Sequence, residues 1–153
     1  MKQLLAAIVI ILLIPSAGYA FPMVSAGKQH LQFGFESIDG DWRVEFGYGR
    51  FFTDELLLGM LFTYERKPAR ATAVSGVMEY HFNLGTMTYP YLSAIVIYED
   101  HPYNDYFRYG PAAGINHFLT PYLSLDLKAR YLYSSSSRRD EDLEFIGSLR
   151  VFF

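Results

Sequence analysis

Apolar and polar side chains alternate along the last ten residues of the chain, EFIGSLRVFF. Counted back from Phe153 in steps of two, the positions are mainly apolar, whereas the positions between them include Glu144 and Arg150. A period of two is that of a β-strand with two different faces. The pattern therefore predicts that the chain ends in a strand.

Seven further segments have strand character and are separated by turn signals. They cover residues 28–36, 42–49, 56–65, 71–82, 90–99, 107–118 and 122–133. The third and fifth segments are almost wholly apolar, so the pattern leaves their facing open. Pro111 interrupts the sixth segment, where it predicts a bulge with one ladder bond lost.

The eight predicted strands are joined by short connections, and none has a sustained period of 3.6 residues. An even number of strands in sequence order favours a meander whose first and last strands pair. Closure also removes the unpaired backbone groups of an open edge. The predicted fold class is all-β, an eight-stranded antiparallel up-and-down barrel.

The first twenty residues do not belong to this barrel. Lys2 gives a positive start, residues 4–14 are apolar, and Pro15 and small residues precede a predicted cleavage after Ala20. This is the layout of a secretory signal peptide, and the apolar run is too short to span a bilayer as a helix. We expect residues 1–20 to be a cleaved signal peptide and residues 21–153 to form one domain.

Composition narrows the class of protein further. Aromatic residues make up 18% of the chain, with 13 Tyr and 13 Phe, and there is no Cys to form a disulfide. Of the 13 basic side chains, Lys2 lies in the leader, which leaves 12 basic against 16 acidic ones. A nucleic-acid partner would require a clustered basic surface, so none is expected.

Alternation alone does not say which face of the barrel points inward. A soluble barrel of the lipocalin kind would hold the apolar row inside, whereas a transmembrane barrel turns it towards lipid. Strands that are mostly about ten to twelve residues long, and aromatic side chains near the strand ends, favour the transmembrane form. One predicted girdle comprises Phe51, Phe52, Phe82, Tyr89, Tyr91, Phe118, Tyr122, Phe152 and Phe153. The other comprises Trp42, Tyr64, Tyr98, Tyr106, Phe107, Tyr133 and Phe145.

Three stretches carry a resemblance to a known family: YGRFFTDELLLGMLFTYE, GINHFLTPYLSLDLKARYLY and the terminal SLRVFF. With them the chain resembles the small outer-membrane barrels of Gram-negative bacteria, the OmpA-type transmembrane domain and its OmpX-like relatives. The resemblance implies an outer-membrane location, a periplasmic N-terminus, and contact with outer-membrane lipid including lipopolysaccharide. It also implies that the barrel-insertion machinery reads the last strand, where the matching residues are Phe145, Leu149, Val151 and Phe153. We expect a monomer.

On this topology six charged side chains point into the lumen: Glu45, Glu79, Asp126, Lys128, Arg130 and Arg150. An eight-stranded barrel is only wide enough to be filled by its own side chains, and isolated buried charges are costly. We therefore expect a structural ion-pair network. A narrow water or ion path and a catalytic carboxylate are the alternatives.

The sequence nominates no catalytic set. Lipid A deacylases carry a His-x-Ser pair, but none of His30, His81, His101 and His117 has Ser two residues later. Scattered histidines without Cys or an HExxH motif indicate neither a metal site nor a cofactor. The Arg138–Arg139 pair suits lipopolysaccharide phosphates. We expect a structural or surface-interaction role without catalytic activity; the alternatives are a narrow ion or water channel and, third, a lipid A-modifying enzyme.

Overall fold

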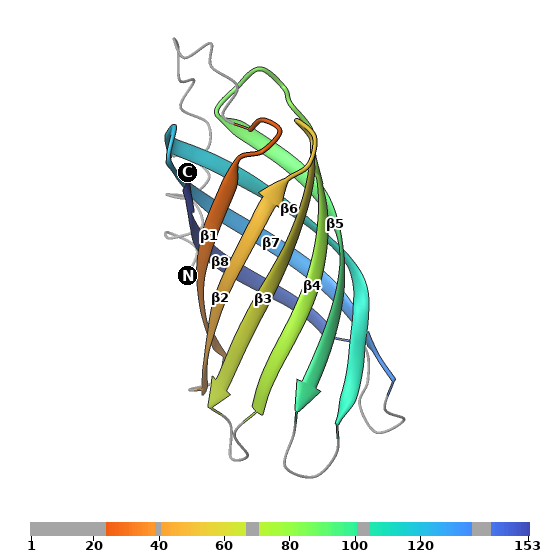
Figure 1. Ribbon diagram of the computed structural model, residues 1–153. Coiled ribbons are helices and arrows are strands. Elements are labelled where there is room, and N and C mark those ends of the chain that lie inside the picture. The colour runs from red at the N-terminus through yellow and green to blue at the C-terminus, as the bar shows by residue number, and fades with distance from the viewer. Residues whose placement is uncertain (1–23, 39–40, 67–70, 101–104, 136–141) are drawn as a thin grey trace.

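The computed structural model describes residues 24–38, 41–66, 71–100, 105–135 and 142–153, and of residues 36–38, 41, 66 and 71 it describes the backbone alone. Eight strands follow one another along the chain (Figure 1). Their bounds are β1 (Gln29–Ile38), β2 (Asp41–Phe51), β3 (Leu56–Arg66), β4 (Ala71–His81), β5 (Thr88–Asp100), β6 (Tyr106–Thr120), β7 (Leu123–Ser134) and β8 (Asp142–Phe152). The predicted signal peptide, Arg138, Arg139 and His101 lie outside the described residues.

The strands form one closed antiparallel barrel in sequence order, and β1 pairs with β8 to complete it. The closing ladder runs from His30–Phe152 to Phe35–Gly147. Because every strand has two neighbours, no sheet edge is left open. The predicted up-and-down meander and its closure are confirmed.

The irregularity in β6 lies away from the proline, so the predicted bulge at Pro111 is wrong. The β6–β7 register shifts between Phe118 and Thr120. Pro111 itself aligns with Ala94 of β5, and the β6–β7 register is the same on both sides of it. A proline in a closed sheet is tolerated where its missing N–H costs a single ladder bond, and no extra residue has to be inserted there.

The two faces of the sheet differ in chemistry. Outward positions carry large apolar side chains that remain exposed, among them Phe35, Met60 and Phe145. Inward positions hold most of the buried charged and polar side chains. A soluble monomer rarely exposes an apolar surface that extends around the whole molecule. This distribution is that of a transmembrane barrel and the reverse of a lipocalin-type barrel.

The same alternation settles the facing of the two apolar strands. In β3 the outward row is Leu58, Met60 and Phe62, and in β5 it includes Leu92 and Val96. Their inward rows supply Leu61, Ile95 and Ile97 to a buried apolar cluster, which Val77 of β4 and Leu132 of β7 complete. Both strands therefore carry large apolar side chains on both faces, and their inward rows also include Glu65 and Glu99.

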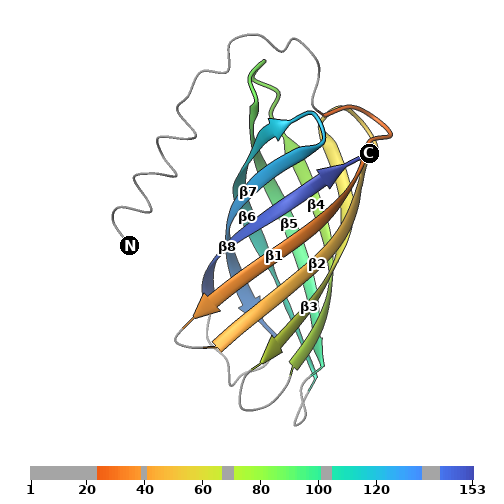
Figure 2. The same cartoon turned by 90° about the vertical axis from the view of Figure 1, so that its left-hand side faces the viewer.

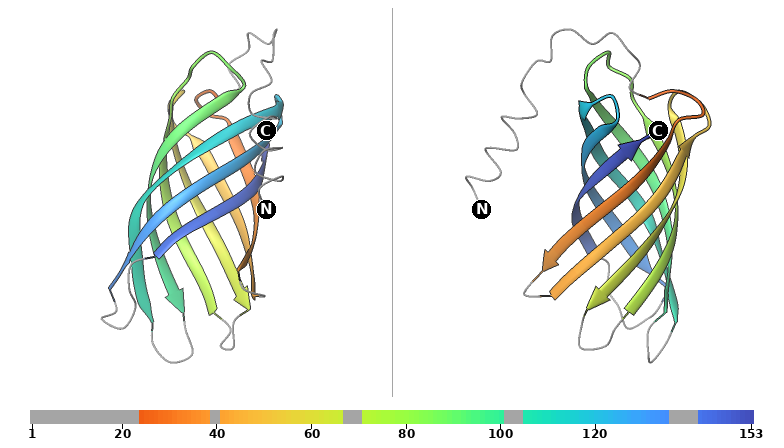
Figure 3. Two further views of the ribbon diagram at one scale, coloured as in Figure 1. Left: turned by 180° about the vertical axis from the view of Figure 1, so that it is seen from behind. Right: turned by 60° about the vertical axis from the view of Figure 1, so that its left-hand side comes forward.

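The barrel has two rims, and Figures 2 and 3 show them from further directions. The terminal rim carries the C-terminus, the start of β1 and the connections 52–55, 82–87 and 121–122. The opposite rim carries the ends of β1, β3, β5 and β7. The described residues contain no helix with the length and hydrophobicity to cross a membrane.

Part of the predicted aromatic girdle at the terminal rim is wrong. Five of its nine members share the inward parity of the lumen charges and are buried: Phe51, Tyr89, Tyr91, Phe118 and Phe152. The other four are exposed on the outside: Phe52, Phe82, Tyr122 and Phe153. At the opposite rim, Tyr106 also turns inward and donates a hydrogen bond to Glu99. Side chains alternate between the two faces of a strand, so these rings point into the lumen even though they lie near a rim of the barrel.

Candidate functional site: the barrel lumen

Arg150 is the centre of a charged cluster in the half of the lumen nearer the terminal rim. Its guanidinium binds both oxygens of Glu79, at 2.7 and 3.0 Å, and Oδ2 of Asp126 at 3.1 Å. The Tyr91 ring lies 5.2 Å from the guanidinium carbon, and His81 is 3.0 Å from Glu79. The cluster joins β4, β5, β7 and β8, so it holds strands together that are not neighbours in the sheet.

A second charged cluster lies towards the opposite rim and is centred on Glu144. This carboxylate accepts hydrogen bonds from Arg130 at 2.6 Å, from Arg43 at 2.9 Å and from Arg108 at 2.9 Å. Arg108 also binds Glu99 at 3.0 Å. Three cations around one carboxylate, with further acids beside them, form a network in which each charge is compensated.

Lys128 lies near Glu45, with Nζ 3.7 Å from its Oε1. The Lys128 ammonium makes no hydrogen bond among the described residues. Glu45 has two other partners, because Gln32 donates to it at 2.8 Å and Arg130 approaches to 3.5 Å. Lys128 is therefore the more weakly held partner of this pair.

All six charged residues proposed from the sequence are buried inside the barrel: Glu45, Glu79, Asp126, Lys128, Arg130 and Arg150. They fall into two groups, since Arg150, Glu79 and Asp126 bind one another, whereas Lys128 and Arg130 approach Glu45.

Sequence reasoning missed the charged residues that surround Arg130: Arg43, Glu65, Glu99, Arg108 and Glu144. The signal was available, because these residues fall on the inward parity of their strands.

Glycines on the inward face make room for the long side chains. A Cβ built on Gly114 would lie 2.4 Å from the Tyr91 ring, and one on Gly49 would lie 2.4 Å from the His30 ring. Each ring thus occupies the space that a neighbouring side chain would need. Each ring packs over the paired residue of the neighbouring strand, as expected where side chains fill a narrow lumen.

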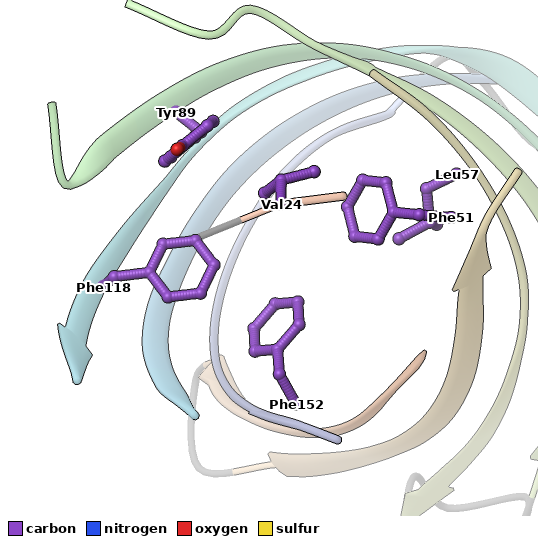
Figure 4. Close-up of a cluster of buried hydrophobic side chains, with 6 residues drawn as sticks. All are labelled: Val24, Phe51, Leu57, Tyr89, Phe118 and Phe152. Atoms are coloured by element: carbon purple, nitrogen blue, oxygen red, sulfur yellow. The ribbon is translucent and has the colours of Figure 1, made fainter. Parts of the chain in front are cut away.

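The terminal end of the lumen is closed by an apolar plug, defined as Val24, Phe51, Leu57, Tyr89, Phe118 and Phe152 (Figure 4). Val24 precedes β1 and lies across the mouth between the rings, with 1% of its surface exposed. No signal in the sequence had indicated this position.

The segment after Val24 is fixed at the mouth by polar contacts. The Ala26 amide donates to Asp54 at 2.9 Å, and the Gly27 amide donates to the Phe51 carbonyl at 2.8 Å. Lys28 donates to the Pro121 carbonyl at 3.1 Å, and partial burial lowers its pKa. These contacts hold the segment against three different strands or connections.

Several buried polar atoms in the lumen have no hydrogen-bond partner among the described residues. They include both amide atoms of Asn116, the Ser124 hydroxyl and one oxygen of Asp126. Buried polar groups in native proteins are usually satisfied, by protein or by water. Groups of this kind are the ones that buried water satisfies in other proteins.

The C-terminal residues proposed as an insertion signal form one outward row on β8 and at its end: Phe145, Leu149, Val151 and Phe153. The inward row of the same strand holds Glu144, Arg150 and Phe152. Within the described residues, no group of three or more His, Cys, Asp or Glu is arranged to hold a metal ion.

No family model and no curated protein matches the sequence. Several solved structures share the architecture. The N-terminal β-barrel domain of Pseudomonas aeruginosa OprF superimposes with a TM-score of 0.69 at 15% identity, covering 84% of this chain and 98% of that one. Neisserial surface protein A superimposes with a TM-score of 0.61 at 15% identity, covering 82% of this chain and 95% of that one. The Yersinia pestis outer membrane protein Ail superimposes with a TM-score of 0.57 at 12% identity, covering 83% of this chain and 99% of that one.

These similarities span nearly the full length of each compared chain, and they agree with the outward apolar surface and the inward charges described above. At such low identity they establish the fold alone. The chain has the fold of the small eight-stranded transmembrane barrels of bacterial outer membranes, which is the fold that its resemblance to OmpA-type domains predicted.

Proposed function

We propose that the chain is an integral outer-membrane protein of a Gram-negative cell, with a structural or surface-interaction role and without catalytic activity. Its terminal rim faces the periplasm, and the connections at the opposite rim face outward. The single observation that carries the proposal is the combination of an apolar outer wall with a lumen filled by ion pairs and closed by the apolar plug.

The chemistry of the outer wall is the evidence for contact with membrane lipid. Exposed apolar side chains occur on all eight strands, among them Phe33 on β1 and Val96 on β5. Aromatic pairs such as Trp42–Tyr64, with centroids 5.7 Å apart, lie near the opposite rim. Aromatic side chains favour the boundary between hydrocarbon and headgroups. Outer-membrane lipid, including lipopolysaccharide, would surround a monomer of this shape.

The barrel-insertion machinery is the second partner in the proposal. The outward row on β8 presents four apolar side chains and ends at Phe153, beside the seam between β8 and β1. This row faces outward, so it can serve recognition before closure and lipid contact afterwards.

Conductance in planar bilayers tests the closed lumen. We expect the protein to give no resolved single-channel steps, because the plug excludes water from the terminal mouth. Val24→Ser combined with Phe152→Ala should thin the plug and raise the bilayer current. Regular steps from the unaltered protein would contradict the closed lumen.

A narrow channel is the second candidate, and the unpartnered polar atoms of Asn116, Ser124 and Asp126 favour it. If water linked these groups into a conducting path, Lys128→Met would change its ion selectivity. An enzyme that modifies lipid A is the third candidate. Overproduction of the protein would then change the acyl content of lipid A, whereas we expect no change.

A further inference from the structure

The outer wall is hollowed where β6, β7, β8 and β1 lie side by side. The hollow has a volume of about 330 Å³. Most of its wall is apolar and comes from all four strands: Phe33, Phe35, Ile115, Leu125, Leu127 and Leu149. The inward residues Asp126 and Ser148 also line it. The other lining residues lie on outward positions, so the hollow opens on the surface that faces hydrocarbon.

Gly147 is the reason that the wall is hollow. It lies on an outward position of β8, and the only atom within 4 Å of a Cβ built there is Cδ2 of Leu127, at 3.7 Å. Phe35 pairs with Gly147 across the β1–β8 seam, and no atom of its ring reaches that space. An aromatic neighbour often covers an exposed glycine in a sheet. Here the neighbours leave the space unfilled.

His117 is the polar side chain among the outward residues that line the hollow. It occupies an outward position of β6 and is only 8% exposed. Its Nδ1 lies 2.9 Å from the Thr88 hydroxyl, and its Nε2 has no partner among the described residues. An ionisable side chain on a membrane-facing wall is costly and is by default a functional hypothesis.

The hollow has a direction with respect to the two rims. His117 pairs with Thr88, the first residue of β5, and so lies near the terminal rim. Gly147 is the central residue of β8 and lies at mid-height. The hollow thus runs from a polar end near one membrane boundary to an apolar end in the middle of the bilayer.

We propose that this hollow binds one acyl chain of a glycerophospholipid from the leaflet at the terminal rim. The chain lies over Gly147, and Nε2 of His117 donates a hydrogen bond to the ester carbonyl while Nδ1 accepts one from Thr88. The proposal rests on the proposed function, since the wall meets lipid only if the barrel spans a membrane.

Three observations favour an acyl chain over a protein partner. The hollow is continuous with the lipid-facing surface, so hydrocarbon enters it without crossing polar groups. It is lined by ten residues, whereas a stable protein interface takes roughly 20–30 on each side. Its polar end matches the ester groups that mark the boundary of the hydrocarbon. Lipopolysaccharide of the opposite leaflet would place its polar groups at the wrong end.

The chain offers a matched pair of variants. Gly147→Leu fills the hollow, and Gly76→Leu adds the same side chain at the central residue of β4, which is also outward. A Cβ on Gly76 has no neighbour within 4 Å. Neither glycine has a positive φ, so both accept leucine. His117→Phe forms a third variant, which keeps a ring and removes the hydrogen bond.

The experiment is native mass spectrometry of the full-length barrel released from nanodiscs that contain phosphatidylethanolamine. We expect one retained phospholipid, unchanged in Gly76→Leu. Gly147→Leu should reduce the occupancy of the bound phospholipid about tenfold. This is the loss of affinity expected when about two methylene groups of its acyl chain are no longer buried. His117→Phe should reduce retention as well.

Equal retention by all variants would overturn the proposal, as would a preference for lipopolysaccharide when both lipids are present. Heat-modifiable gel mobility verifies that each variant is folded. If Gly147→Leu does not fold, Gly147→Ala and His117→Phe decide the question. Failure of the unaltered protein to enter nanodiscs at all would instead contradict the proposed function, so the two failures are distinguishable.

Discussion

Arg150→Met is the substitution for which the structure predicts the largest loss of stability. Arg150 is 0% exposed and donates three hydrogen bonds of 2.7–3.1 Å to Glu79 and Asp126. Methionine keeps much of the apolar stem but leaves two buried carboxylates without their cation. Breaking a buried ion pair by removing one partner costs about 3–5 kcal/mol, since the remaining charge is uncompensated. We therefore expect the free energy of unfolding to fall by about 3–5 kcal/mol.

The size of this loss follows from the carboxylates and not from the missing side chain, which a double variant can show. Combining Arg150→Met with Glu79→Gln removes one of the two uncompensated charges. We expect this double variant to recover part of the loss, because double-mutant cycles isolate such coupling. Recovery would locate the cost in the buried charge.

Urea unfolding in detergent micelles or lipid vesicles measures the effect. Trp42 is the only tryptophan and reports folding by its fluorescence, and gel mobility without heating gives the folded fraction independently. Arg50→Met is the matched control, since Arg50 lies on an exposed outward position of β2 and should change stability by no more than about 0.5 kcal/mol. A loss below about 1 kcal/mol for Arg150→Met would refute the reasoning.

Three further changes have distinct expected outcomes. Lys128→Met should cost only about 1–2 kcal/mol in urea unfolding, because Glu45 keeps other partners; a loss as large as that of Arg150→Met would contradict this. Gly110→Ala should destabilise the barrel by about 1–3 kcal/mol, since its Cβ would lie 1.9 Å from the Tyr131 carbonyl oxygen; an unchanged urea midpoint would argue against this close approach. Phe153→Ser should slow assembly by the insertion machinery, measured as the rate of appearance of the heat-modifiable band, while equilibrium stability changes little; an unaltered rate would remove Phe153 from the proposed signal.

The strands and their facing could be read from the sequence because burial in a barrel follows a period of two. Asp126, Lys128 and Arg130 alternate with Leu125, Leu127 and Ala129, and this parity fixes the lumen side of β7. On each of the strands β2 to β8, the row that faces the lumen contains at least one charged residue. The same alternation also predicts that Arg108 and Glu144 face the lumen, although they were not among the residues expected in the ion-pair network.

The prediction for the aromatic residues is partly wrong because it uses their position along the strand and not the face of the sheet on which they lie. Phe51 and Phe152 lie near the terminal rim, as expected, but they point inward and not towards lipid. Nearness to a strand end predicts a girdle only for outward positions, so parity should have been applied first. Val24 could not be predicted, because its burial depends on the path of a segment outside the sheet.

The hollow over Gly147 also required the three-dimensional register. A glycine in β8 is visible in the sequence, but its neighbours Phe35 and Leu127 come from β1 and β7. Which side chains flank it depends on the closing ladder, and a shift by one residue would place different groups there. The ion pairs depend on the same information, since Arg150 meets Glu79 from across the lumen.

The central claim is that the apolar face of this barrel lies against lipid. Its most direct test is to refold residues 21–153 into detergent micelles and compare gel mobility before and after boiling, with circular dichroism alongside. The account predicts a β-rich band that resists SDS until it is heated and then shifts. No shift, together with good solubility in the absence of detergent, would contradict it.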